Sequence, residues 1–326
     1  MKKFLIFLVS FATILSCIPV MATEKVFKED IYTYTVSGKN ATITNVDDTQ
    51  IKVLIPETLG GYTVTALGDG ACGGSTVIEE IILPDTITMI GSLCFAYSNS
   101  LRKIQFSKKL STVSDGAFYH CEGLWTIALP DGVKTIGNNV FGRCTSLTAV
   151  TLPDTIKSIG KNVFPDTGLI RIYGKENSTA HNYAKANEIP FEEYISVTVN
   201  GKKILFDQPC ITNTEHYRTM VPLRAVLEEL GAEISWDDTF NTAGITILDN
   251  RILIRPGELF MMANGVVHYL SCPSEEFNGR VMIPIRDIIE AIGGTVGWNE
   301  EQKIVTVTCE ITKPSFSNTS TVEKAN

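Results

Sequence analysis

Apolar residues recur every 23 positions through the first half of the chain. Residues 84–106, 107–129 and 130–152 align without a gap, and residues 61–83 follow the same register more loosely. The shared pattern is L-P-x-x-I-x-x-I-G-x-x-x-F-x-x-C-x-x-L-x-x-I-x-L. Its four apolar ladders are Leu67, Ile90, Val113, Ile136 and Ile159; Cys72, Phe95, Phe118, Phe141 and Phe164; Ile78, Leu101, Leu124, Leu147 and, after a one-residue deletion, Leu169; and Ile81, Ile104, Ile127, Val150 and, after the same deletion, Ile172.

This period predicts a solenoid. One unit cannot bury its own apolar face, whereas stacked units join each ladder into a continuous core. A fully buried Leu, Ile or Phe contributes about 1.5–3 kcal/mol, so the interfaces between neighbouring coils should supply most of the stability. Gly68, Gly91, Gly137 and Gly160 follow a strand-like apolar residue, with Ser114 as the one replacement. We expect these glycines to form a tight turn with positive φ.

A longer repeat begins after Val197. The segment R-T-M-V-P-L-R at 218–224 recurs 62 residues later as R-V-M-I-P-I-R at 280–286. Each copy continues into an amphipathic segment, at 225–230 and at 287–292, that ends at a glycine and leads to a strand with a Trp. Proline at the start and glycine beyond the end are typical of a helix. The duplication therefore predicts two similar strand-helix-strand halves.

The I-G-x-x-x-F-x-x-C-x-x-L-x-x-I core of the first repeat resembles the BspA-type leucine-rich repeat, over about residues 31–193. Residues 32–36 and 41–46 look like the N-terminal hairpin of that family, and residues 172–191 look like its helical C-terminal cap. The resemblance implies a secreted or surface protein that adheres to a host or microbial partner, without naming that partner.

The second repeat resembles the copper amine oxidase N-terminal domain, also described as a stalk domain, over about residues 195–309. The resemblance implies a spacer or envelope-associated module. It does not imply amine oxidation, because the copper and quinone chemistry belongs to a separate catalytic domain for which this chain leaves no length.

Together these patterns predict a β-rich protein of two domains, a leucine-rich-repeat solenoid followed by an α+β domain. We expect a signal peptide at 1–22, the solenoid at 27–193, the stalk domain at 195–310 and a polar disordered tail at 311–326.

The first residues have the features of an export signal. They are the lysines at 2 and 3, the apolar run at 4–15 and the small-residue cleavage site V-M-A at 20–22. We expect an extracellular or cell-surface protein. Lipid anchoring at Cys17 is the alternative, although Leu15 fits a lipoprotein signal poorly. No later apolar stretch approaches the ~20 residues that cross a bilayer, and no wall-sorting motif is visible at the C-terminus.

Charge and residue spacing exclude several classes of function. Loss of two lysines with the signal changes the formal net charge from −8 to −10, which argues against nucleic acid because phosphate binding needs a basic surface. The four histidines, at 120, 181, 216 and 268, lie at no metal-ligand spacing with a carboxylate or thiol. No GxSxG, HExxH or phosphate-loop pattern occurs. We expect no enzyme activity, no cofactor and no metal.

Two residue groups leave alternatives open. Cys121 and Cys144 occupy the cysteine position of adjacent coils, where we expect small buried residues. A disulfide or reactive thiol is the alternative, although parallel Cβ vectors aim the sulfurs poorly. Arg218, Arg224, Arg280 and Arg286 suggest either an anion site or, as we favour from their duplicated position, structural contacts with carboxylates such as Asp237.

The exposed x positions of the L-x-x-I-x-L strand are the candidate binding surface. They include Glu80, Lys103, Gln105, Thr126, Arg171 and Tyr173. A mixed, shallow surface suits a protein or glycan partner better than a small substrate, although a merely solvated face is the alternative. We therefore expect a non-catalytic binding or adhesion protein. The second candidate is an accessory or structural cell-envelope protein that binds peptidoglycan or supports wall-active hydrolases.

Overall fold

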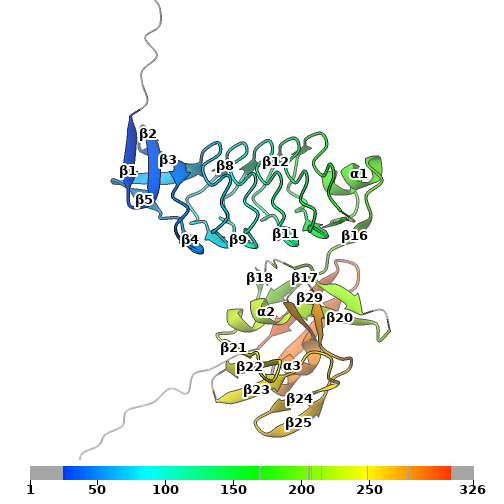
Figure 1. The fold of residues 1–326 in the computed structure, drawn as a ribbon. Helices are drawn as coiled ribbons and strands as arrows, with labels where there is room; N and C mark the ends of the chain where they lie inside the picture. Colours follow the sequence, from blue (N-terminus) through cyan, green and yellow to red (C-terminus); the bar gives the residue numbers. More distant parts are fainter. Residues whose placement is uncertain are drawn as a thin grey trace, which may run out of the picture.

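A computed structural model describes residues 25–309, except residues 169, 205, 207, 214, 248, 278 and 279. The predicted signal peptide with Cys17, the predicted tail and the ladder residue Leu169 lie outside the described residues. Two separate groups of buried apolar side chains divide the chain, one from Ile31 to Ala184 and one from Val197 to Cys309. Figure 1 shows them as an elongated solenoid and a second body beneath it.

The longest sheet of the solenoid collects the first strand of every coil. It begins with the predicted hairpin, in which β2 pairs antiparallel with β3, and β3 then pairs in parallel with β6. From β6 onward, parallel pairing with an offset of 23 residues brings the ladder from Leu67 to Ile159 into register. The strands are β1 (Val26–Glu29), β2 (Tyr32–Ser37), β3 (Asn40–Val46), β5 (Thr58–Leu59), β6 (Tyr62–Leu67), β8 (Met89–Ile90), β10 (Thr112–Val113), β12 (Thr135–Ile136) and β14 (Ser158–Ile159).

The second strand of each coil belongs to one of two shorter sheets, ordered β4-β7-β9 and β11-β13-β15-β16. Parallel pairing brings Ile81 opposite Ile104, and Ile127 opposite Val150 and Ile172. The strands are β4 (Lys52–Leu54), β7 (Glu80–Ile82), β9 (Lys103–Gln105), β11 (Thr126–Ala128), β13 (Ala149–Thr151), β15 (Arg171–Gly174) and β16 (Phe191–Glu193).

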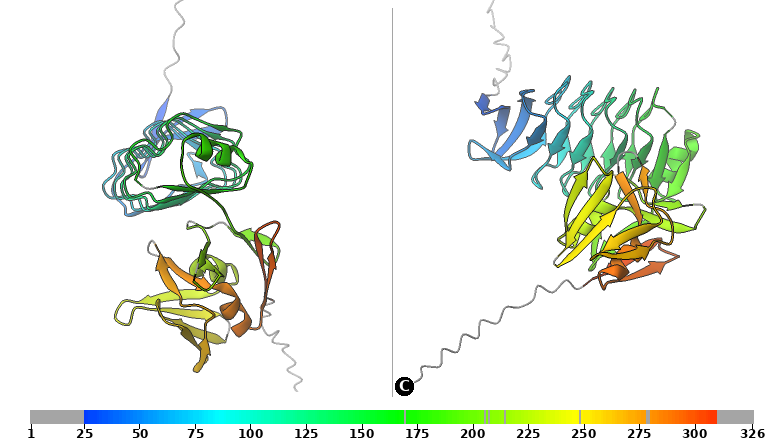
Figure 2. Two further views of the ribbon diagram at one scale, coloured as in Figure 1. Left: turned by 90° about the vertical axis from the view of Figure 1, so that its right-hand side faces the viewer. Right: turned by 60° about the horizontal axis from the view of Figure 1, so that its bottom comes forward.

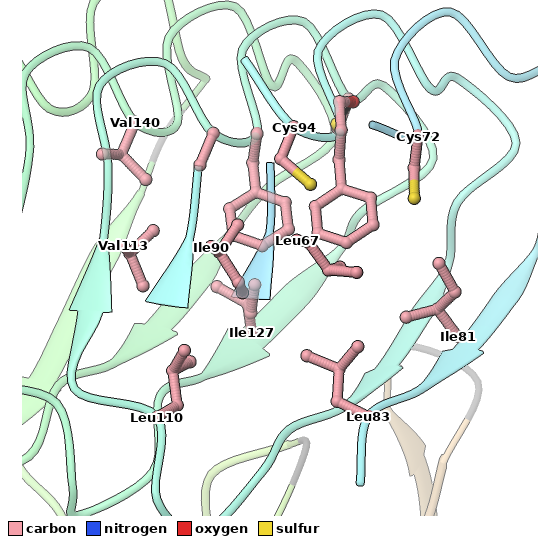
Figure 3. Close-up of a cluster of buried hydrophobic side chains, with 14 of the residues drawn as sticks. Leu67, Cys72, Ile81, Leu83, Ile90, Cys94, Leu110, Val113, Ile127 and Val140 are labelled. Carbon is pink, nitrogen blue, oxygen red and sulfur yellow. Dashed lines mark hydrogen bonds between the residues drawn. The ribbon is translucent and has the colours of Figure 1, made fainter. Parts of the chain in front are cut away.

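The predicted ladders form the core between these sheets (Figure 3). The side chains of Phe95, Phe118 and Phe141 are at most 1% exposed. Together with Phe164 they form one stack, with successive ring centroids 5.1, 5.5 and 5.5 Å apart and rings within 10° of parallel. The interior is therefore continuous from coil to coil, as the period predicts.

The repeat glycines have a different role from the one expected. Gly68, Gly91, Gly137 and Gly160 do not have positive φ, so the predicted turn is wrong. A Cβ added to Gly91 would lie 2.6 Å from the carbonyl carbon of Gly68, and one added to Gly160 would lie 2.4 Å from that of Gly137. Glycine suits this position because the backbones of adjacent coils approach closely.

The solenoid ends in the predicted helical cap. Helix α1 (Thr179–Ala186) begins after Ser178, whose side chain accepts a hydrogen bond from the His181 amide. Strand β16 follows and pairs in parallel with β15. The cap covers the last coil, which has no following coil to bury its face.

The described residues of the second body form three sheets and two short helices. Their orders are β18-β17-β29-β28, β19-β20-β27-β26 and β21-β22-β23-β24-β25. The elements are β17 (Ser196–Val199), β18 (Lys202–Ile204), β19 (Ile211–Asn213), β20 (Arg218–Pro222), α2 (Leu223–Glu229), β21 (Glu233–Asp237), β22 (Thr242–Ile247), β23 (Asn250–Ile254), β24 (Phe260–Ala263), β25 (Val266–Tyr269), β26 (Glu275–Phe277), β27 (Arg280–Pro284), α3 (Ile285–Ala291), β28 (Thr295–Asn299) and β29 (Ile304–Thr308).

The predicted duplication is confirmed, because β20, α2 and β21 recur as β27, α3 and β28 at an offset of 62 residues. Both helices begin two residues earlier than predicted, directly after Pro222 and Pro284. Strands β20 and β27 pair antiparallel, with Met220 opposite Pro284 and Pro222 opposite Met282. Equivalent residues therefore exchange places, which relates the halves by an approximate two-fold axis.

Only Tyr194 and Ile195 connect β16 to β17. The second body contacts the solenoid there, because Lys203 Nζ lies 2.7 Å from Asp131 Oδ2 and 5.6 Å from the centroid of the Tyr194 ring. Figures 1 and 2 show the second body on the side of the solenoid that carries β9 and β11. A two-residue, half-buried junction is a poor protease site, so limited proteolysis would be a weak test of whether the two bodies fold independently.

We expect residues 25–193 and 195–310 to fold as separate units, because each holds its own apolar core. Each fragment, expressed alone, should unfold in urea in one cooperative transition. The far-ultraviolet circular dichroism spectra of the two fragments should together reproduce the spectrum of the full chain. If either fragment is unfolded alone at the concentration where the full chain is folded, the two units depend on each other.

Candidate functional site

The first half of the predicted binding surface is a row of charged side chains. Glu80 on β7 lies between Lys52 on β4 and Lys103 on β9, with N to O distances of 3.2 and 3.3 Å. Burial alone would raise the pKa of Glu80, but the two lysines outweigh it and hold that pKa below its usual value. Gln105 is exposed at the end of β9. These residues lie on the three-stranded sheet β4-β7-β9.

The second half differs in part from the prediction. Thr126 on β11 is half-buried, whereas Arg171 on β15 is exposed, as expected, and forms an ion pair with Glu192 of β16. Tyr173 is only 7% exposed, so it is not the exposed contact that the repeat pattern suggested. Burial raises the pKa of its hydroxyl. The pattern fails there because β15 is the last strand of the repeat, and the cap strand β16 lies beside it.

The second body adjoins the same side of the later coils. Ala128 and Thr151, at x positions of β11 and β13, line a pocket of about 40 Å³ together with Lys203 and Phe206. The predicted residues therefore do not form one uniform surface. The predicted residues on β7 and β9 form one group. The predicted residues from β11 onward lie on the sheet that adjoins the second body.

The turns on the other side of the coils hold bulky residues in the left-handed conformation. One repeat position has positive φ in five successive coils, at Gly74, Tyr97, His120, Arg143 and Asp166. This conformation costs a bulky residue about 1–2 kcal/mol. The Tyr97 and His120 rings stack there, with centroids 5.0 Å apart, and Tyr97 remains 51% exposed. Residue type varies too much at this position for the sequence to reveal its backbone conformation.

A polar pocket of about 260 Å³ lies at the N-terminal end of the same turns. It is lined by Asn45, Val46, Asp47, Asp48, Ala71, Cys72, Gly73, Gly74 and Ser75. Sequence reasoning did not identify this pocket. The signal was the run D-G-A-C-G-G at 69–74, which replaces the larger side chains of later coils.

The cysteine position of the repeat is a hydrogen-bond donor between coils. Cys121 Sγ donates to the Phe95 carbonyl at 2.9 Å, and Cys144 Sγ donates to the Phe118 carbonyl at 3.0 Å. The hydroxyls of Ser98 and Thr167 make the equivalent contacts in other coils, at 2.7 and 2.9 Å. Burial raises the pKa of the Cys144 thiol to about 12. The expected burial of Cys121 and Cys144 is confirmed, and both thiols are free in the structure.

Comparison with known families agrees with this architecture. The sequence profile of the BspA type leucine-rich repeat region matches residues 65–188 in six copies. The profile of the copper amine oxidase N-terminal domain matches residues 198–310. The chain is a BspA-type leucine-rich-repeat region followed by a copper amine oxidase N-terminal domain. Neither match is to a catalytic domain.

Several solved leucine-rich-repeat structures are similar. A leucine-rich-repeat protein of Treponema pallidum is 27% identical, with a TM-score of 0.43, over 46% of this chain and 71% of that one. A leucine-rich cell surface protein of Faecalibacterium prausnitzii is 22% identical, with a TM-score of 0.37, over 59% and 60%. The pneumococcal vaccine antigen PcpA is 22% identical, with a TM-score of 0.38, over 47% and 50%. No curated protein is significantly similar to this chain.

Two of the duplicated arginines of the copper amine oxidase N-terminal domain make the structural contacts with carboxylates that we favoured, although with a glutamate of their own helix and not with Asp237. Arg224 pairs with Glu228 at 3.3 Å and Arg286 with Glu290 at 4.0 Å, one helical turn along α2 and α3. The Asp237 carboxylate accepts hydrogen bonds from the amides of Thr239 and Phe240. Helical spacing brings each arginine closer to a glutamate of its own helix.

The histidines lie apart from one another. His120 stacks on Tyr97, His181 stacks on Phe191, His216 contacts Asn213, and His268 lies on β25. Among the residues that the structure describes, no three His, Cys, Asp or Glu side chains cluster as a metal site would need. Each helix in the described ranges is too short or too polar to cross a bilayer.

We expect Cys121→Ala to lower the free energy of unfolding by about 1–3 kcal/mol, because the buried Phe95 carbonyl loses its side-chain donor. Cys121→Ser should stay within about 1 kcal/mol of the unmodified chain, because Ser98 makes the same contact in another coil. Urea denaturation of the two variants measures this. If both variants lost the same free energy of unfolding, the hydrogen bond from Cys121 to the Phe95 carbonyl would contribute nothing to stability.

We also expect the purified chain to hold no stoichiometric copper and to oxidise no amine, because its histidines are scattered and neither matched family is a catalytic domain. Metal analysis after gentle purification, with an amine oxidation assay, measures both. One tightly held copper ion per chain would contradict this expectation.

Proposed function

We propose that this chain is exported to the cell surface or the medium, where it acts as a non-catalytic binding or adhesion protein. Its partner would be an extracellular protein or glycan. The repeat region would provide the recognition surface, and the copper amine oxidase N-terminal domain would act as spacer or envelope contact.

The observation that carries this proposal is the row of exposed and half-buried charged and polar side chains over β4, β7 and β9. Lys52, Glu80, Lys103 and Gln105 lie on strands whose alternate residues are the core ladders. A repeat protein presents such equivalent positions as one extended surface on a fixed scaffold. The row can therefore vary in chemistry without disturbing the ladders.

The second candidate, a role in the cell envelope through peptidoglycan, is favoured by the outer face of β24 and β25. Phe260 and Met262 lie opposite Tyr269 and Val267 on that face. All four are exposed, Tyr269 at 83%. Such an apolar face usually marks a contact site, and aromatic rings on it suit the apolar faces of sugars.

We expect the double variant Lys103→Ala with Gln105→Ala to weaken partner binding at least tenfold while it changes the stability by less than about 1 kcal/mol, because both side chains are outside the core. The probes are immobilised extracellular-matrix proteins, mucin and purified peptidoglycan. The matched control is Lys109→Ala, an exposed lysine of the following loop.

If the double variant bound a matrix protein or mucin as strongly as the unmodified chain does, the row over β4, β7 and β9 would not be the recognition surface. Binding to peptidoglycan alone, lost in Tyr269→Ala and kept in the double variant, would favour the envelope role instead.

A further inference from the structure

We propose that the N-terminal end of the solenoid holds a carbohydrate-binding site, in which an uncharged sugar ring lies on the free face of Tyr97. The hydroxyl groups of that sugar would reach the polar pocket beside Asp47 and Asp48. This site goes beyond the function proposed above, because it uses the turn side of the coils and not the strands β4, β7 and β9.

The ring contacts of Tyr97 among the described residues come from the following coil. His120 stacks on the ring, with centroids 5.0 Å apart and an interplanar angle of 27°, and Tyr119 meets it edge-on, with centroids 5.7 Å apart. In the preceding coil the equivalent residue is Gly74, whose amide donates to the carbonyl of Ala96 at 2.7 Å. Because Gly74 has no side chain, the other face of Tyr97 stands above bare backbone. An exposed aromatic face of this kind suits the C–H face of a sugar ring.

The pocket next to this backbone supplies oriented hydrogen-bond acceptors. The Asp47 carboxylate accepts hydrogen bonds from Lys28 Nζ at 2.8 Å and from Asn45 Nδ2 at 3.1 Å. The Asp48 carboxylate accepts one from Ser75 Oγ at 2.6 Å. These contacts hold the carboxylates in place, and each carboxylate can accept further hydrogen bonds. Sugar hydroxyls are donors, so they would meet acceptors that need little rearrangement.

The ring of Tyr97 is available at the surface. Tyr97 is 51% exposed, so the stability of the coil does not require the ring. Its positive φ of 62° is shared by His120 and Arg143 at the same position of the later coils, so the repeat sets this conformation.

The charge of the pocket selects the class of sugar. Asp47 and Asp48 line it, and the whole chain has a formal net charge of −8. The negative charges of the two aspartates and of the chain would repel the carboxylates of uronic and sialic acids at short range. The site therefore fits neutral or N-acetylated glycans.

The experiment is affinity gel electrophoresis of the full chain in native gels that contain soluble mannan, β-glucan or galactan, with polygalacturonate and hyaluronan as acidic probes. We expect at least one neutral probe to retard the chain and neither acidic probe to do so. Tyr97→Asn should weaken that binding at least tenfold, with a Tm equal to or above that of the unmodified chain, because Asn accepts positive φ more readily.

Two further variants separate the ring from the fold. Tyr97→Phe keeps the stacking face and should bind within threefold of the unmodified chain. Gly74→Asn keeps the positive φ of 75°, meets nothing within 4 Å at its Cβ and fills the space beside the ring, so it should also weaken binding at least tenfold. Asp166→Asn, at the same repeat position in the last coil, is the control and should bind normally.

The proposal is overturned if no neutral probe retards the chain, if the acidic probes bind instead, or if Tyr97→Asn and Gly74→Asn bind as the unmodified chain does. Its failure is distinguishable from failure of the strand surface, because Lys103→Ala with Gln105→Ala should leave binding to the neutral probes unchanged. Loss of a protein partner, and not of a glycan, in Tyr97→Asn would show that the same surface recognises protein.

Discussion

The close stacking of coils, at an offset of 23 residues through most of the repeat, is the constraint on which the solenoid depends. The backbone contact at Gly91 and Gly160, the phenylalanine stack and the hydrogen bonds from the cysteine position all join residues of neighbouring coils. Each requires the same distance between coils, so the three contacts support one another. A substitution that spread two coils apart would weaken all three at once, which is why interfaces between repeats dominate the stability of such proteins.

The sequence was sufficient to predict the features that follow from periodic burial. The ladders, the hairpin before them and the cap after them all lie where the pattern predicted, because an apolar residue at a repeated position has only the neighbouring coil to pack against. The duplication in the second half was equally visible, since R-x-M-[VI]-P-[LI]-R fixes a strand, a helix start and an arginine at one offset.

Features that depend on local backbone geometry or on neighbouring units were missed or mistaken. A glycine in a repeat signals either positive φ or close approach, and only the structure distinguishes the two, as Gly91 shows. Tyr173 has the pattern of an exposed residue, but the cap strand changes its surroundings. Arg224 has several carboxylates within the same domain, and helical spacing selects Glu228. For Tyr173 the deciding contact, with the cap strand, lies outside the period that the sequence displays.

The two sides of the solenoid are under different constraints, which bears on where recognition evolves. On the strand side the second domain adjoins the later coils through Asp131 and Lys203, so a change there must suit both the partner and this contact. On the turn side the buried ladder already fixes each coil, and unfavourable conformations at Tyr97 and His120 are therefore tolerated. Stability from the repeated core thus allows strained, exposed side chains on the turns, and a new contact arises there with the least effect on the rest of the fold.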